Sequence, residues 1–136
     1  MAVMTEPELR WLLLTIAWTG LLWVPYIAQL MVQLGPVAAV WDPTGAHPHE
    51  AAWALRAKRA HYNAVENLVL FAPLVLMVHE AQLGDGLTAT ACAVYFVARV
   101  AHYVIHVAAI PVARTLAFLI GWGATAVLAL RLAGWV

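Results

Sequence analysis

Four long apolar runs follow one another along the chain, and shorter segments rich in proline, glycine or charge separate them. An α-helix needs roughly 20 mostly apolar residues to cross a bilayer, and each run is long enough. The pattern therefore predicts four membrane-spanning helices in one domain, at about residues 9–34, 51–82, 87–109 and 112–134. Pro25 is expected to kink the first helix. The predicted fold class is all-α, an integral membrane four-helix bundle.

The segments between the runs have the composition of loops. The stretch GPVAAVWDPTGAHPHE holds three of the seven prolines, LGDG makes a tight turn, and Pro111 separates the last two helices. Four spans bring the first and third loops to one side of the membrane and both termini to the other. Lys and Arg are more frequent around these two loops, which assigns the loops to the cytoplasm and the termini to the periplasm. The Ala- and Val-rich composition favours a bacterial inner membrane.

Composition supports a membrane protein and excludes several other classes. Hydrophobic residues make up 65% of the chain and charged residues only 10%, too few to cover a soluble domain. Seven basic residues balance seven acidic ones, so no net field would recruit nucleic acid. Cys92 is the only cysteine, which excludes an intramolecular disulfide and a metal site built on cysteines. The N-terminus lacks the positive segment of a cleaved signal peptide, so we expect a retained span.

Polar residues recur on one face of the second predicted helix. They are separated by three, four and three positions, the spacing of neighbours on a helical face. These residues are Arg56, Arg59, Asn63 and Glu66. An ionised group at membrane depth costs ~2.5–3.5 kcal/mol on insertion scales, so such groups usually face a bundle interior, a partner subunit or a water-filled cavity. The stripe therefore predicts a functional site. A structural alternative is an ion pair between Arg59 and Glu66, or with another helix.

A second polar stripe lies on the third predicted helix, at Arg99, His102 and His106, with spacings of three and four. Arg114 and Thr115 follow early in the fourth helix. Arginine binds planar carboxylates and phosphates, and its charge stabilises a thiolate. Because both stripes lie toward the same membrane face, we expect them to converge on a pocket for an anionic ligand. Such a pocket would admit a polar cosubstrate from water and an apolar one from the bilayer.

The motifs around these residues carry a family resemblance. The second helix contains R-x-x-R-A-x-x-N-x-x-E followed by N-L-x-x-F, the third contains A-R-V-A-H-x-x-x-H, and the fourth begins P-x-x-R-T-x-x-F. With four spans and a long second helix, the chain resembles the MAPEG family, the membrane-associated proteins of eicosanoid and glutathione metabolism. That family includes microsomal glutathione transferases and membrane-bound leukotriene and prostaglandin synthases. The resemblance covers nearly the whole chain.

The resemblance implies a left-handed four-helix bundle that assembles as a homotrimer. It also implies glutathione as cosubstrate, bound between neighbouring subunits near the cytoplasmic face. Carried over by position, Arg59, Asn63 and Glu66 would bind glutathione, with Arg56 nearby. The second substrate would be a hydrophobic small molecule that enters from the bilayer, and membrane lipids would surround the protein.

The third and fourth helices also match the family pattern. Arg99 and His102 match polar positions of the family's third helix, and His106 continues that stripe. Arg114 matches the arginine proposed to hold the glutathione thiolate, which makes it the candidate catalytic residue. A free thiol has a pKa of ~8.5, and an adjacent cation raises the reactive thiolate fraction near neutrality.

This sequence departs from the family pattern at several positions. His106 and Asn67 stand where tyrosines are common in the eicosanoid synthases. The first loop has no Arg or Lys, whereas the eicosanoid branches carry arginines there that help to hold the glutathione carboxylates. The chain contains no serine, so Thr115 would replace the serine often found after the thiolate arginine. These departures concern the cosubstrate rather than the fold, because packing depends on the apolar faces.

Two functions of different classes fit these features. The resemblance implies glutathione-dependent transfer or peroxide reduction on a hydrophobic electrophile. The alternative is a non-catalytic membrane module that binds lipid or another anionic amphiphile, or an accessory subunit of a larger membrane complex.

A metal site is a third reading of the sequence. Its possible ligands are His47, His49, Glu50, His61, His102 and His106. His47 and His49 fall in a proline-rich exposed loop, and the charge of Arg99 beside the last two histidines opposes a cation. We therefore predict no metal.

Overall fold

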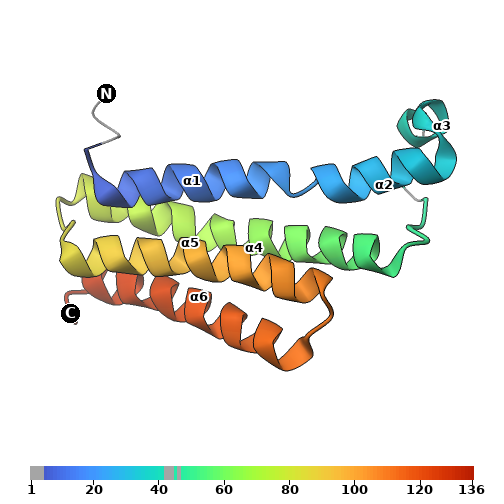
Figure 1. The fold of residues 1–136 in the computed structure, drawn as a ribbon. Coiled ribbons are helices and arrows are strands. Elements are labelled where there is room, and N and C mark those ends of the chain that lie inside the picture. Colours follow the sequence, from blue (N-terminus) through green and yellow to red (C-terminus); the bar gives the residue numbers. More distant parts are fainter. Residues whose placement is uncertain (1–4, 42–44, 46) are drawn as a thin grey trace.

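Four long helical segments form an antiparallel bundle in the computed structural model (Figure 1). The structure describes residues 5–41, 45 and 47–136. Its elements are α1 (Pro7–Leu21), α2 (Val24–Leu34), α3 (Pro36–Val40), α4 (Ala52–Glu80), α5 (Gly86–Val107) and α6 (Pro111–Leu132). α1 and α2 together form one candidate membrane span, and α4, α5 and α6 form the other three. The prediction of an all-α integral membrane protein with four spans is confirmed, and the span ends lie within two residues of the predicted ones.

The first span is interrupted between α1 and α2, next to Pro25, where the sequence predicts a disturbed helix. Proline lacks a backbone N–H, and its ring would clash with the carbonyl of Leu21 in a straight helix. α1 ends at Leu21, and the N–H of Leu22 bonds instead to the Thr19 carbonyl at 3.2 Å. The helix then resumes at Val24.

The first loop contains a short helix, α3, that the hydrophobic pattern did not predict. Gly35 ends α2 with a φ of +82°, a conformation that favours glycine. Pro36 then occupies the first helical position, where its fixed φ is compatible with a helix and its missing N–H costs nothing. A Gly-Pro pair that reads as a loop signal therefore starts one more turn of helix.

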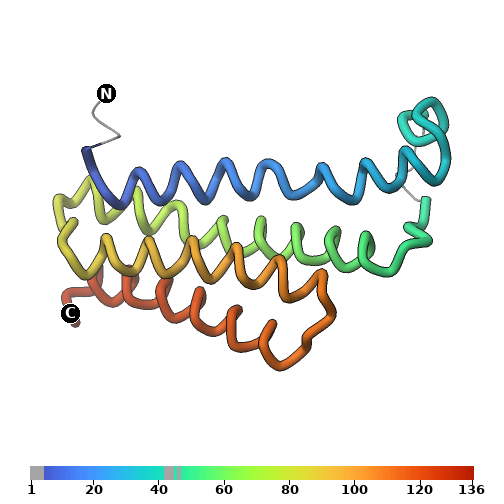
Figure 2. The backbone as a smooth tube through the Cα atoms, viewed as in Figure 1, coloured from blue at the N-terminus to red at the C-terminus, as the bar shows by residue number. Residues whose placement is uncertain are grey.

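The core of the bundle consists of two separate apolar clusters. α5 packs against α1, α4 and α6. The cluster toward the termini contains Leu12, Phe71, Val75, Val78, Ala91, Cys92, Tyr95, Ala124 and Leu128. The cluster toward the first and third loops contains Leu22, Tyr26, Ala54, Ala57, Ala60, Ala64 and Tyr103. Among the described residues, no member of this second cluster lies on α6, and α6 inclines away from α4 toward its own first residue (Figure 2). The start of α6 is thus left without an apolar core beneath it.

The first half of α4 presents two faces of different chemistry. One face carries the buried alanines of the second cluster, which pack against α2 and Tyr103. Small side chains of this kind let membrane helices approach closely. The polar stripe from Arg56 to Glu66 occupies other positions of the same turns, away from α2. The close packing on one face therefore fixes the direction in which the polar stripe points.

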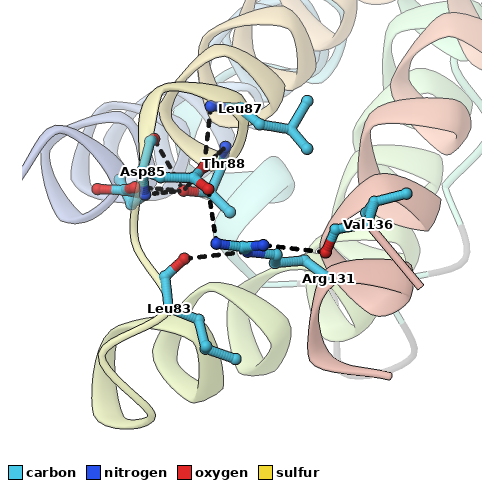
Figure 3. A network of polar contacts seen from close by, with 7 residues as sticks. Leu83, Asp85, Leu87, Thr88, Arg131 and Val136 are labelled. Atoms are coloured by element: carbon cyan, nitrogen blue, oxygen red, sulfur yellow. Dashed lines mark hydrogen bonds and ion pairs between the residues drawn. The ribbon is translucent and has the colours of Figure 1, made fainter. Parts of the chain in front are cut away.

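A polar network joins the α4–α5 turn to α6 at the end that holds the termini (Figure 3). Asp85 caps α5: its carboxylate accepts from the backbone N–H of Leu87 at 2.9 Å and of Thr88 at 3.0 Å, and it pairs with Arg131 at 2.7 Å. The backbone bond from Thr88, with a smaller contribution from Arg131, holds the pKa of Asp85 below its usual range. Thr88 also donates to the buried Glu8 at 2.5 Å, which ties α1 to the same turn.

The three helices α4, α5 and α6 end in the same hydrogen-bonded motif, which places one residue in the left-handed region. After α4, Gln82 has a φ of +56° and the next N–H, of Leu83, bonds to the Val78 carbonyl at 3.0 Å. Ala109 after α5 has a φ of +62°, and Gly134 after α6 has a φ of +73°. Of the three positions, only the one after α6 carries glycine, the residue that this conformation favours.

Exchanging residues at these helix ends should change stability in opposite directions. Gln82→Gly removes the steric cost of a left-handed side chain and should raise the free energy of unfolding by about 0.5–1 kcal/mol. Gly134→Ala introduces that cost and should lower it by about 1 kcal/mol. Thermal unfolding of the detergent-purified variants measures both, and shifts of the same sign would contradict the assignment of the motif.

Candidate functional site

A pocket of 460 Å³ opens between α4, α5 and α6, where the second apolar cluster has no α6 residue. Its walls combine the polar stripe of α4, two histidines of α5 and the first two turns of α6. The lining residues are Arg59, Tyr62, Asn63, Glu66, His102, His106, Arg114, Thr115 and Phe118. The two polar stripes therefore meet at one pocket, and they do so within a single subunit.

Arg114 and the two histidines form the wall opposite α4. The Nη1 atom of Arg114 lies 3.4 Å from Nε2 of His106, and that nitrogen accepts because a guanidinium can only donate. The rings of His106 and His102 stand edge to face with centroids 5.5 Å apart. Arg114 thus has one neighbour that orients it, while Thr115 bonds to its own helix at the Pro111 carbonyl.

Arg99 lies behind the pocket, not in its wall. Its side chain is only 2% exposed, and Nη1 donates to Oδ1 of Asn63 at 3.2 Å. The guanidinium also lies over the rings of Tyr95 and Phe118, at 5.7 and 5.5 Å from the centroids. Its Nε and Nη2 atoms are buried without a hydrogen-bond partner among the described residues. Arg99 therefore acts on the pocket through two lining residues, Asn63 and Phe118, which makes it a positioning residue.

Arg56 also lies outside the pocket. Its Nε atom donates to the Val107 carbonyl at 2.8 Å, which ties the start of α4 to the end of α5. It lines a smaller neighbouring cavity of 230 Å³ that shares His106 and Arg114 with the main pocket. Six of the eight predicted site residues thus line the pocket, and Arg56 and Arg99 stand next to it.

The charged groups of the pocket are not paired with one another. Within the part of the chain that the structure describes, Arg59 and Glu66 form no ion pair with each other or with another helix. The ion pair that was the structural alternative for the stripe is therefore not formed among the described residues of this subunit. The lining contains two guanidinium groups, of Arg59 and Arg114, and one carboxylate, of Glu66. It therefore has an excess of positive charge when the histidines are neutral. The pocket is suited to an anionic ligand that also carries a cationic group.

The family model for MAPEG matches residues 9–134 of the chain. The chain belongs to the MAPEG family. This match confirms the resemblance and includes every residue that lines the pocket. Searches of curated proteins and of solved structures found no match.

Two other histidines of this MAPEG protein form hydrogen bonds outside the pocket. In the described segments, no three His, Cys, Asp or Glu side chains come together as ligands. His61 bonds through Nδ1 to the Tyr26 hydroxyl at 2.9 Å. His49 bonds through Nδ1 to Oε1 of Gln29, also at 2.9 Å, and partial burial, assisted by the charge of Lys58, lowers its pKa. These contacts hold the first loop and α4 against α2.

Sequence reasoning did not include Tyr62 and Phe118 among the site residues. Tyr62 lies three positions after Arg59 and four before Glu66, so helical spacing already placed it on the polar face. Phe118 lies four positions after Arg114 on α6. Phe118 stands in an apolar sequence, where nothing distinguishes a pocket wall from a lipid-facing position until the helices are packed.

Gly121 makes room for the buried Arg99 of this MAPEG protein. A Cβ atom at Gly121 would lie 3.1 Å from Nε and 3.2 Å from Nη2 of that arginine, whereas one at Gly123 would meet nothing within 4 Å. Gly121→Ala should therefore destabilise the protein by about 1–3 kcal/mol, because the guanidinium is confined between two rings. Gly123→Ala should stabilise it by up to about 1 kcal/mol through helix propensity alone.

Thermal unfolding of the two glycine variants checks this account. Gly121→Ala and Gly123→Ala add the same methyl group to the same helix, so each controls for the other. Equal melting temperatures would show that Arg99 is not held as described.

Proposed function

We propose that this MAPEG protein is a glutathione-dependent enzyme that acts on hydrophobic electrophiles in the membrane, by transfer or by peroxide reduction, and that it works as a homotrimer. The observation that carries the proposal is the single pocket that combines Arg59 and Glu66 of α4 with Arg114 of α6. Among the described residues none of these three groups forms an ion pair, and an unpaired charge at membrane depth is costly unless a ligand or water meets it.

The charges of the pocket complement those of glutathione. The tripeptide has two carboxylates, one ammonium group and one thiol. A guanidinium binds a carboxylate through parallel N–H donors, and this suits Arg59. Glu66 accepts from the ammonium group, about two helical turns away from Arg59 on the same face. Asn63, between them, offers a donor because Arg99 already occupies its carbonyl oxygen.

Arg114 would act on the thiol. A cation beside the sulfur favours the thiolate, which is the reactive nucleophile. The proton of the thiol leaves to the water that enters the open pocket. In a transfer reaction the thiolate attacks an electrophilic carbon, a C–S bond forms, and the leaving group departs with its bonding electrons. No protein residue becomes covalently modified.

Peroxide reduction uses the same thiolate. It attacks a peroxide oxygen, the O–O bond breaks, and the alkoxide takes a proton to become an alcohol. A second glutathione then reduces the resulting sulfenic acid, which yields glutathione disulfide and water. Both reactions depend on the charge and position of Arg114 and on the proximity of the bound reactants.

The surroundings of the pocket suit a substrate from the bilayer. Phe118 and the exposed Tyr62 add aromatic surface to the polar lining. In the proposed trimer a neighbouring subunit closes the open side, and the loops at this end face the cytoplasm, the source of glutathione. The Trp- and Leu-rich outer faces remain in lipid, so an apolar electrophile reaches the thiolate laterally.

Removing one charge of the α4 stripe should weaken glutathione binding. Hydrogen bonds to charged groups are worth about 1.5–3 kcal/mol, so Glu66→Gln or Arg59→Gln should raise the Kd about 10- to 100-fold. Isothermal titration of the purified protein measures this. Lys58→Gln is the matched control, because Lys58 is a cation on the same helix that does not line the pocket. An intact protein that binds no glutathione would favour the non-catalytic module instead.

Removing Arg114 should change the pH profile of turnover. In Arg114→Gln the bound thiol returns toward its ordinary pKa of ~8.5, so only a few per cent is thiolate at pH 7. The rate with an apolar aryl halide should fall about 10- to 100-fold at pH 7 and recover as the pH rises toward 9, while the wild-type rate stays flatter. A variant whose profile parallels that of the wild type would show that Arg114 does not activate the thiol.

A further inference from the structure

The smaller cavity beside the pocket is a binding site candidate in its own right. It has a volume of 230 Å³ and lies between the first turns of α4 and the α5–α6 turn. Its lining residues are Arg56, His106, Ala109, Ile110, Pro111 and Arg114. Liquid water occupies about 30 Å³ per molecule, so the space holds a small anionic group with part of its hydration shell.

Arg56 is oriented toward this cavity by its bond to the backbone. Because Nε donates to the Val107 carbonyl, the two terminal nitrogens remain available, and neither has a hydrogen-bond partner among the described residues. Arg114 contributes a second guanidinium from α6. The described residues that line the cavity include no carboxylate, so nothing in its wall neutralises these two cations. Two forked donors converging from different helices match the oxygens of a phosphate group.

The backbone around the cavity adds to the positive field. α6 has 22 residues and begins at Pro111 without a side-chain cap, so the N–H groups of Val112 and Ala113 have no partner in the helix. The positive end of the helix dipole opens at the same point. Ala109 holds the turn in a left-handed conformation with a φ of +62°, which sets the end of α5 against Arg56.

The position of the cavity identifies the source of the phosphate. It lies where the candidate span α5 ends and the candidate span α6 begins, the depth at which the headgroups of a bilayer would be expected. Below it, α6 exposes a continuous apolar track at Val112, Leu116 and Leu119, which are 73%, 56% and 52% exposed. An acyl chain can follow this track while its headgroup reaches the arginines.

We propose that this cavity binds the phosphate group of a membrane phospholipid, with Arg56 and Arg114 as the phosphate ligands. The occupancy of this site does not require the protein to be an enzyme, although one of its two ligands, Arg114, is also the residue proposed to act on the thiol. The cavity shares Arg114 and His106 with the main pocket, so a bound headgroup and a ligand in that pocket contact opposite sides of one wall.

Lipid titration followed by native mass spectrometry tests the site. The detergent-purified protein is titrated with dioleoyl phosphatidylglycerol, or with dioleoylglycerol, which has the same chains but no phosphate. We expect the wild type to bind the phospholipid at least about fivefold more tightly. Arg56→Gln should remove this preference, and Lys58→Gln should keep it. Arg56→Lys retains the charge but not the bond to Val107, so its preference for the phospholipid should be intermediate. This variant replaces Arg56→Gln in the test if Arg56→Gln does not fold.

Each outcome bears on a different part of the proposal. An unchanged preference for the phospholipid in folded Arg56→Gln or Arg56→Lys would overturn the site. Inorganic phosphate provides a separate arm, measured as the rise in melting temperature. If phosphate alone stabilises the wild type but not Arg56→Gln, and the phospholipid binds no better than dioleoylglycerol, the anion site stands and the lipid source is wrong.

Discussion

A charged side chain inside a bilayer must either find a partner or face water, and this constraint divides the bundle into two ends. Toward the termini, apolar side chains of α1, α4, α5 and α6 fill the interior. Toward the first and third loops, the core involves α2, α4 and α5, and the space beneath α6 is lined by arginines, histidines and one glutamate. In the described part of the chain, the pocket lies where the apolar cluster contains no α6 side chain.

Arg99 contacts both the apolar cluster toward the termini, at Tyr95, and the pocket, at Asn63. It lies on α5, the helix that packs against α1, α4 and α6, and its charge is accommodated by two aromatic rings and by the space at Gly121. Its single hydrogen bond to another side chain reaches Asn63 on α4. Arg99, a charged side chain whose burial is costly, thus orients the pocket residue Asn63. This contact links the packing of α5 on α6 to the geometry of the site.

The wall formed by His106 and Arg114 gives the site a second feature, because it borders two cavities. One cavity combines acidic and basic groups, and the other has basic groups only. The two ligands proposed for these cavities, a zwitterionic peptide and a phosphate, differ in charge in the same way. Arg56 and Arg59 are close in sequence and lie on one helical face. They nevertheless line different cavities, Arg59 the main pocket and Arg56 the smaller one.

The sequence by itself determined the four spans, the interruption of the first span near Pro25, the family and most of the pocket residues. Helical periodicity and the cost of charge in lipid depend on local sequence, so Arg59, Asn63 and Glu66 could be read as one functional face. Only the tertiary structure decided that Arg99 supports Asn63 from behind, that Arg56 belongs to a neighbouring cavity, and that α3 adds a turn to the first loop. The physical reason is that spacing assigns a residue to a helical face, whereas its partners depend on how that helix is rotated and inclined against the others. Those angles follow from packing at distant positions, such as the alanines of α4 and Gly121 of α6.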